Sequence, residues 1–165
     1  MKKIVFLLFA VTSTMVFGQK YHEVKIDALE VLVTPAVDIS YEYAINDYGA
    51  VGTSVFFRID APKTREFRKF MLSPYYRHHF YNNKSYGQKG FFIEGLVNYV
   101  NYEDQRQDDK NYGDFGIGFG GGVKLISGGG FTVDGHAALI RNFQSDDRSD
   151  DFLIRFGVNF GFRFM

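Results

Sequence analysis

The chain has 165 residues, and its 19 basic residues balance its 19 acidic residues, so the formal net charge is zero. This composition shows no sign of the concentrated basic face of a nucleic-acid-binding protein, and we expect no nucleic-acid partner. Cysteine is absent, which excludes a disulfide scaffold and thiol chemistry. The 19 Phe, 11 Tyr and 18 Gly favour strands over helices.

The first segment of the chain has the order of a secretory signal peptide. Lys2 and Lys3 precede an apolar run over residues 4–11, and small residues lead to Gly18. The run is shorter than the roughly 20 apolar residues that a transmembrane helix needs. We therefore predict a signal peptide over residues 1–18, cleaved near Gly18, and one mature domain over residues 19–165. No cysteine follows the apolar run, so we do not expect a lipoprotein.

The rest of the chain divides into eight segments in which outward apolar residues alternate with polar residues or glycine. The predicted strands cover residues 23–31, 37–45, 51–59, 70–80, 91–102, 115–125, 131–140 and 152–164. In the first of them, Val24, Ile26 and Ala28 form the lipid face. The last strand alternates over 13 residues, well beyond the 5 or 6 that are typical of soluble proteins.

Eight long amphipathic strands in an exported chain predict closure into a barrel, because every backbone polar group must be hydrogen-bonded in lipid. The predicted fold class is therefore all-β: an eight-stranded antiparallel up-and-down transmembrane β-barrel in the bacterial outer membrane. A soluble secreted β-sandwich is the alternative.

In such barrels the periplasmic turns are short and the outer loops are longer, and most connections of this chain follow that rule. Residues 46–49 and 127–129 predict tight periplasmic hairpins, and residues 103–111 and 144–151 predict longer, charged outer loops. Two connections depart from the rule, because residues 33–35 are short on the outer side and residues 81–89 are long on the inner side. Pro74 lacks an N–H for the ladder and predicts a local bulge.

The inner faces of these strands carry equal numbers of cations and anions. The cations are Lys25, Arg58, Arg77, Lys124, Arg155 and Arg163, and the anions are Asp27, Asp38, Glu42, Glu94, Asp114 and Asp134. The lumen of an eight-stranded barrel is only wide enough for side chains, so these groups are expected to pair and to hydrogen-bond with Tyr75, Asn98 and Asn159. The alternative is a selectivity pathway for a narrow channel.

The histidines are the candidates for catalysis. His79 and His136 fall on the inner face, His78 points toward lipid and His22 lies at the mouth. The lipid-modifying barrel enzymes that deacylate lipid A carry a His-x-Ser motif, which does not occur here. His79 and Ser73 form the best available base and nucleophile, and we do not predict an enzyme.

Two further patterns resemble ligand sites and are better explained structurally. The acidic loop over residues 145–151, with Asp108 and Asp109, lacks the alternating spacing and central glycine of a calcium loop, so a solvated loop is expected. A strand period runs through the glycines between residues 116 and 122, and no helix follows them, so they indicate close packing and not dinucleotide binding. We expect no metal or other cofactor.

Five short segments resemble an uncharacterised family of bacterial outer-membrane β-barrels, a domain of unknown function similar in architecture to small eight-stranded barrels. They are ISYEY (39–43), SPYYR (73–77), GFFIEG (90–95), FGIGFG (115–120) and GFRF (161–164). The resemblance implies the location and the fold and assigns no catalytic residue. It also implies two partners, outer-membrane lipid and the barrel-assembly machinery, which reads the C-terminal strand.

Three functional hypotheses follow. The first is a structural or surface-interaction protein with a side-chain-filled polar interior, in which an extracellular ligand would bind to the charged loops. The second is a narrow channel for small solutes, and the third is a lipid-modifying outer-membrane enzyme.

Overall fold

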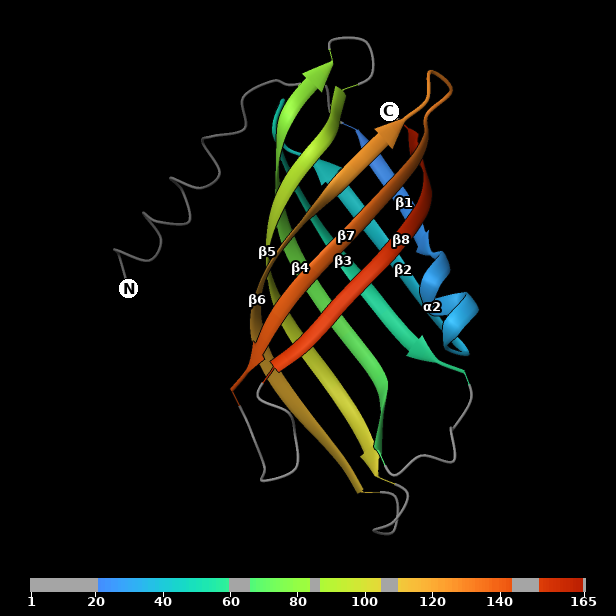
Figure 1. Ribbon diagram of the computed structural model, residues 1–165, viewed down its shortest axis with the longest axis vertical. Helices are drawn as coiled ribbons and strands as arrows, with labels where there is room; N and C mark the ends of the chain where they lie inside the picture. Colours follow the sequence, from blue (N-terminus) through green and yellow to red (C-terminus); the bar gives the residue numbers. More distant parts are fainter. Residues whose placement is uncertain (1–20, 60–65, 84–86, 105–109, 144–151, 165) are drawn as a thin grey trace, which may run out of the picture.

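The computed structural model describes residues 21–59, 66–83, 87–104, 110–143 and 152–164. Within these residues eight strands form one closed barrel, in which each strand pairs antiparallel with its neighbours in the chain and β1 closes the ring against β8 (Figure 1). The strands are β1 (His22–Asp27), β2 (Ala36–Ala44), β3 (Gly49–Arg58), β4 (Glu66–Asn83), β5 (Gly87–Asp104), β6 (Lys110–Ile126), β7 (Phe131–Asn142) and β8 (Phe152–Phe164). The prediction of an eight-stranded antiparallel barrel is confirmed.

Alternation along each strand determines which side chains face outward. In β8 the outward residues Phe152, Ile154 and Phe156 are exposed, whereas Arg155 and Asn159, which occupy alternate positions of the same strand, are buried. Successive side chains of a strand point to opposite faces, so the same period places aromatic and aliphatic groups outside and polar groups inside. The predicted signal peptide lies outside the described residues.

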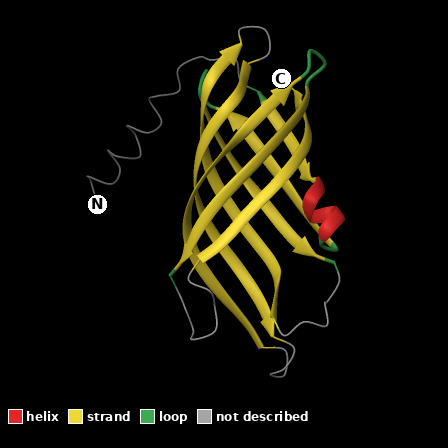
Figure 2. Ribbon diagram, in the orientation of Figure 1, coloured by secondary structure: helices red, strands yellow, loops and turns green. Residues whose placement is uncertain are grey.

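The first strand is shorter than predicted, because residues 28–31 belong to a helix. This helix, α2 (Ala28–Val33), is capped by Asp27, whose Oδ1 accepts hydrogen bonds from the backbone N–H of Leu29 (2.9 Å) and Glu30 (3.4 Å). A carboxylate at the N-cap followed by good helix formers favours a helix locally. Ala28 is therefore not part of the outward strand face, and the prediction of a strand through residue 31 was wrong. Figure 2 shows α2 outside the barrel wall, beside the end of β1.

The connection over residues 81–89 was also predicted incorrectly. The ladder between β4 and β5 continues through Tyr81↔Lys89 to Asn83↔Gly87, after a register shift between His79 and Tyr81. Gly87 has φ +73°, a conformation that glycine adopts readily at the start of β5. The polar composition of residues 81–83 and 87–89 is typical of a loop, but these residues belong to the paired ends of β4 and β5.

Pro74 does not cause the predicted bulge. The register of β4 against β5 is the same on either side of it, at Leu72↔Tyr99 and Tyr75↔Leu96, and Pro74 itself lies opposite Thr53 of β3. A proline costs one ladder hydrogen bond, but its fixed φ is compatible with an extended strand. The two register shifts on this strand lie instead between Arg68 and Phe70 and between His79 and Tyr81.

Both tight hairpins are present where they were predicted. Asn46 accepts hydrogen bonds through Oδ1 from the N–H groups of Tyr48 (3.0 Å) and Gly49 (2.7 Å), and Ser127 N–H donates to the carbonyl of Phe131 (2.9 Å). These hairpins lie at the end of the barrel that carries Phe164, here called the C-terminal end (Figure 1). At the opposite end β4, β5 and β6 extend past the other strands.

The sequence predicts a polar interior, but the interior of the structure is only partly polar. Two apolar clusters lie inside the barrel; one consists of Ala36, Phe56, Met71 and Val100, and the other of Tyr75, Leu96, Ala138 and Ile140.

None of the helices in the described part of the chain is both long enough and apolar enough to cross a membrane.

Candidate functional site

A buried ion-pair network crosses the barrel interior, and the carboxylate of Glu42 lies at its centre. Glu42 Oε2 accepts from Lys25 Nζ (2.8 Å), Arg77 Nη1 (3.0 Å) and the hydroxyl of Tyr75 (3.1 Å), and Oε1 accepts from Lys124 Nζ. Only 2% of Glu42 is exposed. Three cations and one hydroxyl surround this buried carboxylate, and such compensation is the condition for keeping a charge inside a protein.

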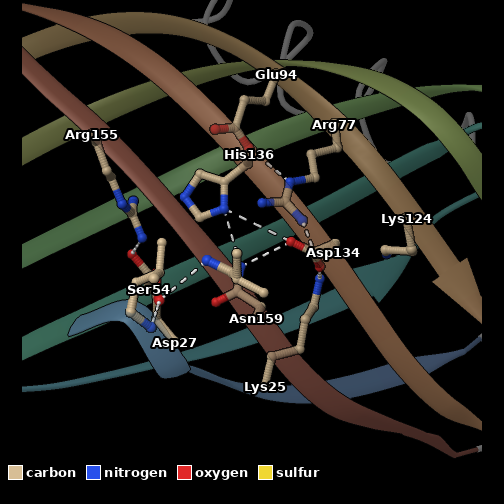
Figure 3. Close-up of polar contacts among 12 residues, drawn as sticks. Lys25, Asp27, Ser54, Arg77, Glu94, Lys124, Asp134, His136, Arg155 and Asn159 are labelled. Atoms are coloured by element: carbon tan, nitrogen blue, oxygen red, sulfur yellow. Dashed lines mark hydrogen bonds and ion pairs between the residues drawn. The ribbon is translucent and has the colours of Figure 1, made fainter. Parts of the chain in front are cut away.

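The network continues to two further carboxylates (Figure 3). Lys25 Nζ also donates to Asp134 Oδ2 (2.9 Å), and Arg77 donates through Nε to Glu94 (2.7 Å) and through Nη1 to Asp134 (3.4 Å). These residues come from β1, β2, β4, β5, β6 and β7, so the ion pairs tie six of the eight strands together across the lumen.

Glu23 is a member of the network that the sequence interpretation missed. It accepts from Lys124 Nζ (2.9 Å) and Arg163 Nε (2.6 Å), and it is 2% exposed. Glu23 lies two residues before Lys25 on the same strand, so the period of two already placed it on the inner face. Its position at the very start of the predicted strand made its face less evident than that of the residues that follow.

The C-terminal end of the barrel is closed by hydrogen bonds between loops and strands. Gln88 Nε2 donates to the backbone carbonyls of Asn46 (2.7 Å) and Gly49 (2.8 Å), and Arg163 Nη2 donates to the carbonyl of Gln88 (3.1 Å). The Arg163 guanidinium also lies 4.9 Å from the ring centroid of Tyr21. Side chains therefore fill this end as well as the middle.

A separate polar group lies nearer the opposite end. Arg155 Nη2 donates to Asp38 Oδ2 (3.0 Å) and to the hydroxyl of Ser54 (2.8 Å), and both of these acceptors are buried. Ser73 donates to Asn98 Oδ1 (2.8 Å) at a neighbouring level. These contacts join β8 directly to β2 and β3 through the interior.

Three of the twelve predicted residues do not join either group. Asp27 caps α2, Arg58 is only partly buried with its guanidinium 5.5 Å from the ring centroid of Phe67, and Asp114 Oδ2 has no hydrogen-bond partner among the described residues. Among the described residues, five buried cations therefore stand against seven buried anions, and the predicted balance of six against six is wrong. The buried cations are Lys25, Arg77, Lys124, Arg155 and Arg163, and the buried anions are Glu23, Asp27, Asp38, Glu42, Glu94, Asp114 and Asp134.

The geometry does not bring together the suggested catalytic pair. Ser73 and His79 lie on the same strand six residues apart, which corresponds to about 20 Å at the usual rise per residue. Ser73 is bonded to Asn98, while the His79 ring lies 5.4 Å from that of Phe92 and neither of its nitrogens has a described hydrogen-bond partner. A base must lie within hydrogen-bond reach of its nucleophile, so these two residues do not form a dyad.

The other histidines occupy structural positions. His136 Nδ1 lies 3.2 Å from Asn159 Nδ2 beside the ion-pair network. His22 contacts the rings of Tyr41 and Phe164 at the C-terminal end of the wall, and His78 contacts the rings of Tyr48 and Phe80.

The acidic loop over residues 145–151 and its neighbours Asp108 and Asp109 lie outside the described residues.

The glycines of β6 permit close approach of β7. A Cβ at Gly122 would lie 2.1 Å from the carbonyl oxygen of Gly135, and one at Gly120 would lie 2.5 Å from that of Ala137. This geometry supports the interpretation of the glycine run as close packing.

No protein-family model matches the chain, and no curated protein matches it in sequence. Two solved structures share its fold at 14% sequence identity. The N-terminal β-barrel domain of OprF from Pseudomonas aeruginosa superimposes with a TM-score of 0.62, covering 88% of this chain and 96% of that domain. Neisserial surface protein A (NspA) superimposes with a TM-score of 0.51, covering 87% of this chain and 95% of that one. The predicted architectural resemblance to small eight-stranded outer-membrane barrels is confirmed.

Proposed function

We propose that this chain is exported to the bacterial outer membrane, where its filled barrel serves as a structural or surface-interaction protein. The observation that carries the proposal is the Glu42-centred network, which ties six strands together across the lumen. Charges that compensate one another in this way can be kept in a closed interior, and their side chains occupy the lumen that an ion would have to cross.

The outward surface supports the proposed location. Large apolar side chains are exposed on every strand, among them Ile39, Phe57, Phe91, Phe119 and Ile154. Such a surface would be costly in water and is expected where lipid chains surround the wall. Outer-membrane lipid is therefore a proposed partner. The barrel-assembly machinery is another, through the aromatic end of β8.

A surface role is favoured by the strands that extend past the rim. β4 and β5 have 18 residues each and β6 has 17, whereas about 9–11 tilted residues span a bilayer. Part of the excess lies at the end opposite Phe164 (Figure 1), and Lys69 and Glu103 form an ion pair on that part of the sheet. We propose this sheet and the charged loops predicted over residues 103–111 and 144–151 as the surface for an extracellular ligand.

Planar-bilayer conductance tests the filled interior directly. The protein is refolded into lipid, insertion is verified by heat-modifiable migration on a gel, and current is recorded under applied voltage. We expect no stable single-channel steps, because the Arg77 and Lys25 pairs occupy the lumen. Stable, uniform current steps from inserted protein would overturn the proposal of a side-chain-filled interior and would favour a narrow channel for small solutes.

A further inference from the structure

The wall of the barrel has an interruption beside α2. The ladder between β1 and β8 runs from His22↔Phe164 to Asp27↔Asn159, whereas β8 continues to Phe152. In the described part of the chain no strand pairs with residues 152–158 on that side, because α2 takes the place of a longer β1. At six residues β1 is shorter than the roughly 9–11 that span a bilayer.

Unpaired backbone groups at membrane depth are tolerated where they line a cavity. A cavity of about 140 Å³ lies at this interruption, between α2 and β8. Its apolar lining includes Leu29 and Val33 from the helix and Ile154 and Phe156 from the strand. This volume is similar to that of cavities that hold a benzene-sized molecule. We call this cavity and its border of α2 and residues 152–158 the lateral opening.

The inner side of the lateral opening is charged, because Arg68, Arg155 and Glu30 all line the cavity. Each arginine forms an ion pair there, Arg68 with Glu30 and Arg155 with Asp38. Arg155 reaches across the interior to Ser54 and Asp38 (Figure 3), and Arg68 Nη2 donates to Glu30 of α2 (2.9 Å). A guanidinium carries five N–H donors, and both described hydrogen bonds of Arg155 use Nη2. The remaining donors suit a carboxylate or phosphate oxygen.

The outer side is strongly apolar. Leu32 and Val33 on α2 are 80% and 79% exposed, and Ile154 on β8 is 68% exposed. A ligand that fits both sides has a hydrocarbon chain and an acidic head group, and it reaches the site sideways from the bilayer. Neither a free anion nor an uncharged hydrocarbon would use both halves of the lining.

We propose that the lateral opening binds one acidic amphiphile of the surrounding bilayer. The head group lies against the guanidinium groups of Arg68 and Arg155, and the start of the hydrocarbon chain packs between Leu29, Val33 and Phe156. The inference rests on the proposed membrane location, and it adds a ligand site in the wall that the filled lumen does not require.

A fluorescence experiment tests the site, because the chain contains no tryptophan. Leu32→Trp places one fluorophore beside the lateral opening, and Phe119→Trp is a matched control on β6, where the native side chain is 74% exposed. Both variants are refolded into phosphatidylcholine vesicles, with heat-modifiable migration as the check on insertion. Nitroxide-labelled stearic acid at alkaline pH and its uncharged methyl ester are the two quenching probes.

We expect the acid to quench the Leu32→Trp reporter at about tenfold lower concentration than the ester, since charge-assisted hydrogen bonds commonly contribute that much. The Phe119→Trp reporter should respond to both probes alike. Adding Arg68→Gln or Arg155→Gln to the Leu32→Trp variant should remove the preference for the acid. If Arg155→Gln does not insert, Arg68→Gln, which lies nearer the rim, decides alone.

Equal quenching by acid and ester at Leu32→Trp in inserted protein would overturn the lateral site, as would a preference that survives Arg68→Gln. Neither result would affect the proposed filled barrel. Failure of the wild-type chain to insert at all would count against the membrane location itself, so the two proposals fail separately.

Discussion

At the scale of single residues, Glu42 has the greatest influence on the interior. Its carboxylate contacts three cations and one hydroxyl drawn from three other strands. Lys25 is held between Glu42 and Asp134, the latter 109 residues away in the chain. Removing one member of such a group leaves buried charges of the other sign without compensation, and that cost exceeds the value of an ordinary surface pair.

Glu42→Gln should therefore lower the free energy of unfolding by about 3–5 kcal/mol. Urea titration of the vesicle-inserted protein, followed by loss of heat-modifiable migration, measures the change. Arg77→Ala should destabilise the barrel to a similar extent. Glu103→Gln is the control, because its pair with Lys69 lies on the exposed sheet and should contribute at most about 1 kcal/mol. An unchanged midpoint for both Glu42→Gln and Arg77→Ala would contradict the account of the core.

At the scale of elements, the pairing of β6 with β7 depends on glycine at close-contact positions. The Gly122 Cα faces the carbonyl oxygen of Gly135, and the clash that a Cβ would make is with backbone, which cannot move without shifting the strand. Gly135 itself has no atom within 4 Å of the Cβ position. An added methyl group would therefore clash at Gly122 and would meet no atom at Gly135.

Gly122→Ala should destabilise the folded barrel by about 1–3 kcal/mol, the usual cost of overpacking. Gly135→Ala adds the same methyl group to the neighbouring strand and should change stability by far less. The same urea titration compares the two variants. Equal destabilisation by both would show that loss of glycine matters only through strand conformation and not through contact.

At the scale of the whole molecule, closure of the sheet and the apolar exterior act together. The ring from β1 to β8 leaves few unpaired backbone groups, and the exterior presents aromatic and aliphatic side chains all around the wall. We therefore expect the folded barrel to resist unfolding by detergent at low temperature, because its strands are mutually hydrogen-bonded.

Two measurements on cells expressing the chain test this description. The protein should fractionate with the outer membrane, and unheated samples should migrate differently from boiled samples on a denaturing gel. Recovery in the soluble periplasmic fraction, with identical migration before and after boiling, would instead support a secreted β-sandwich.

The sequence by itself determined the strand class, the number of strands and most of the inner face, because alternation is a local property of consecutive residues. It also contained the capping signal at Asp27, although the longer outward pattern was preferred there. Glu23 followed from the same alternation and was overlooked at the strand boundary.

Only the tertiary structure decided which charges meet. Whether Lys25 contacts Asp134 or Asp38 depends on how eight strands are staggered around the ring, and no local pattern contains that information. The separation of Ser73 and His79, by contrast, follows from their spacing of six residues along one strand, which the sequence already contained. The interruption beside α2 also became visible only once the ladder to β8 was known, since a short strand matters only through the partner that it leaves unpaired.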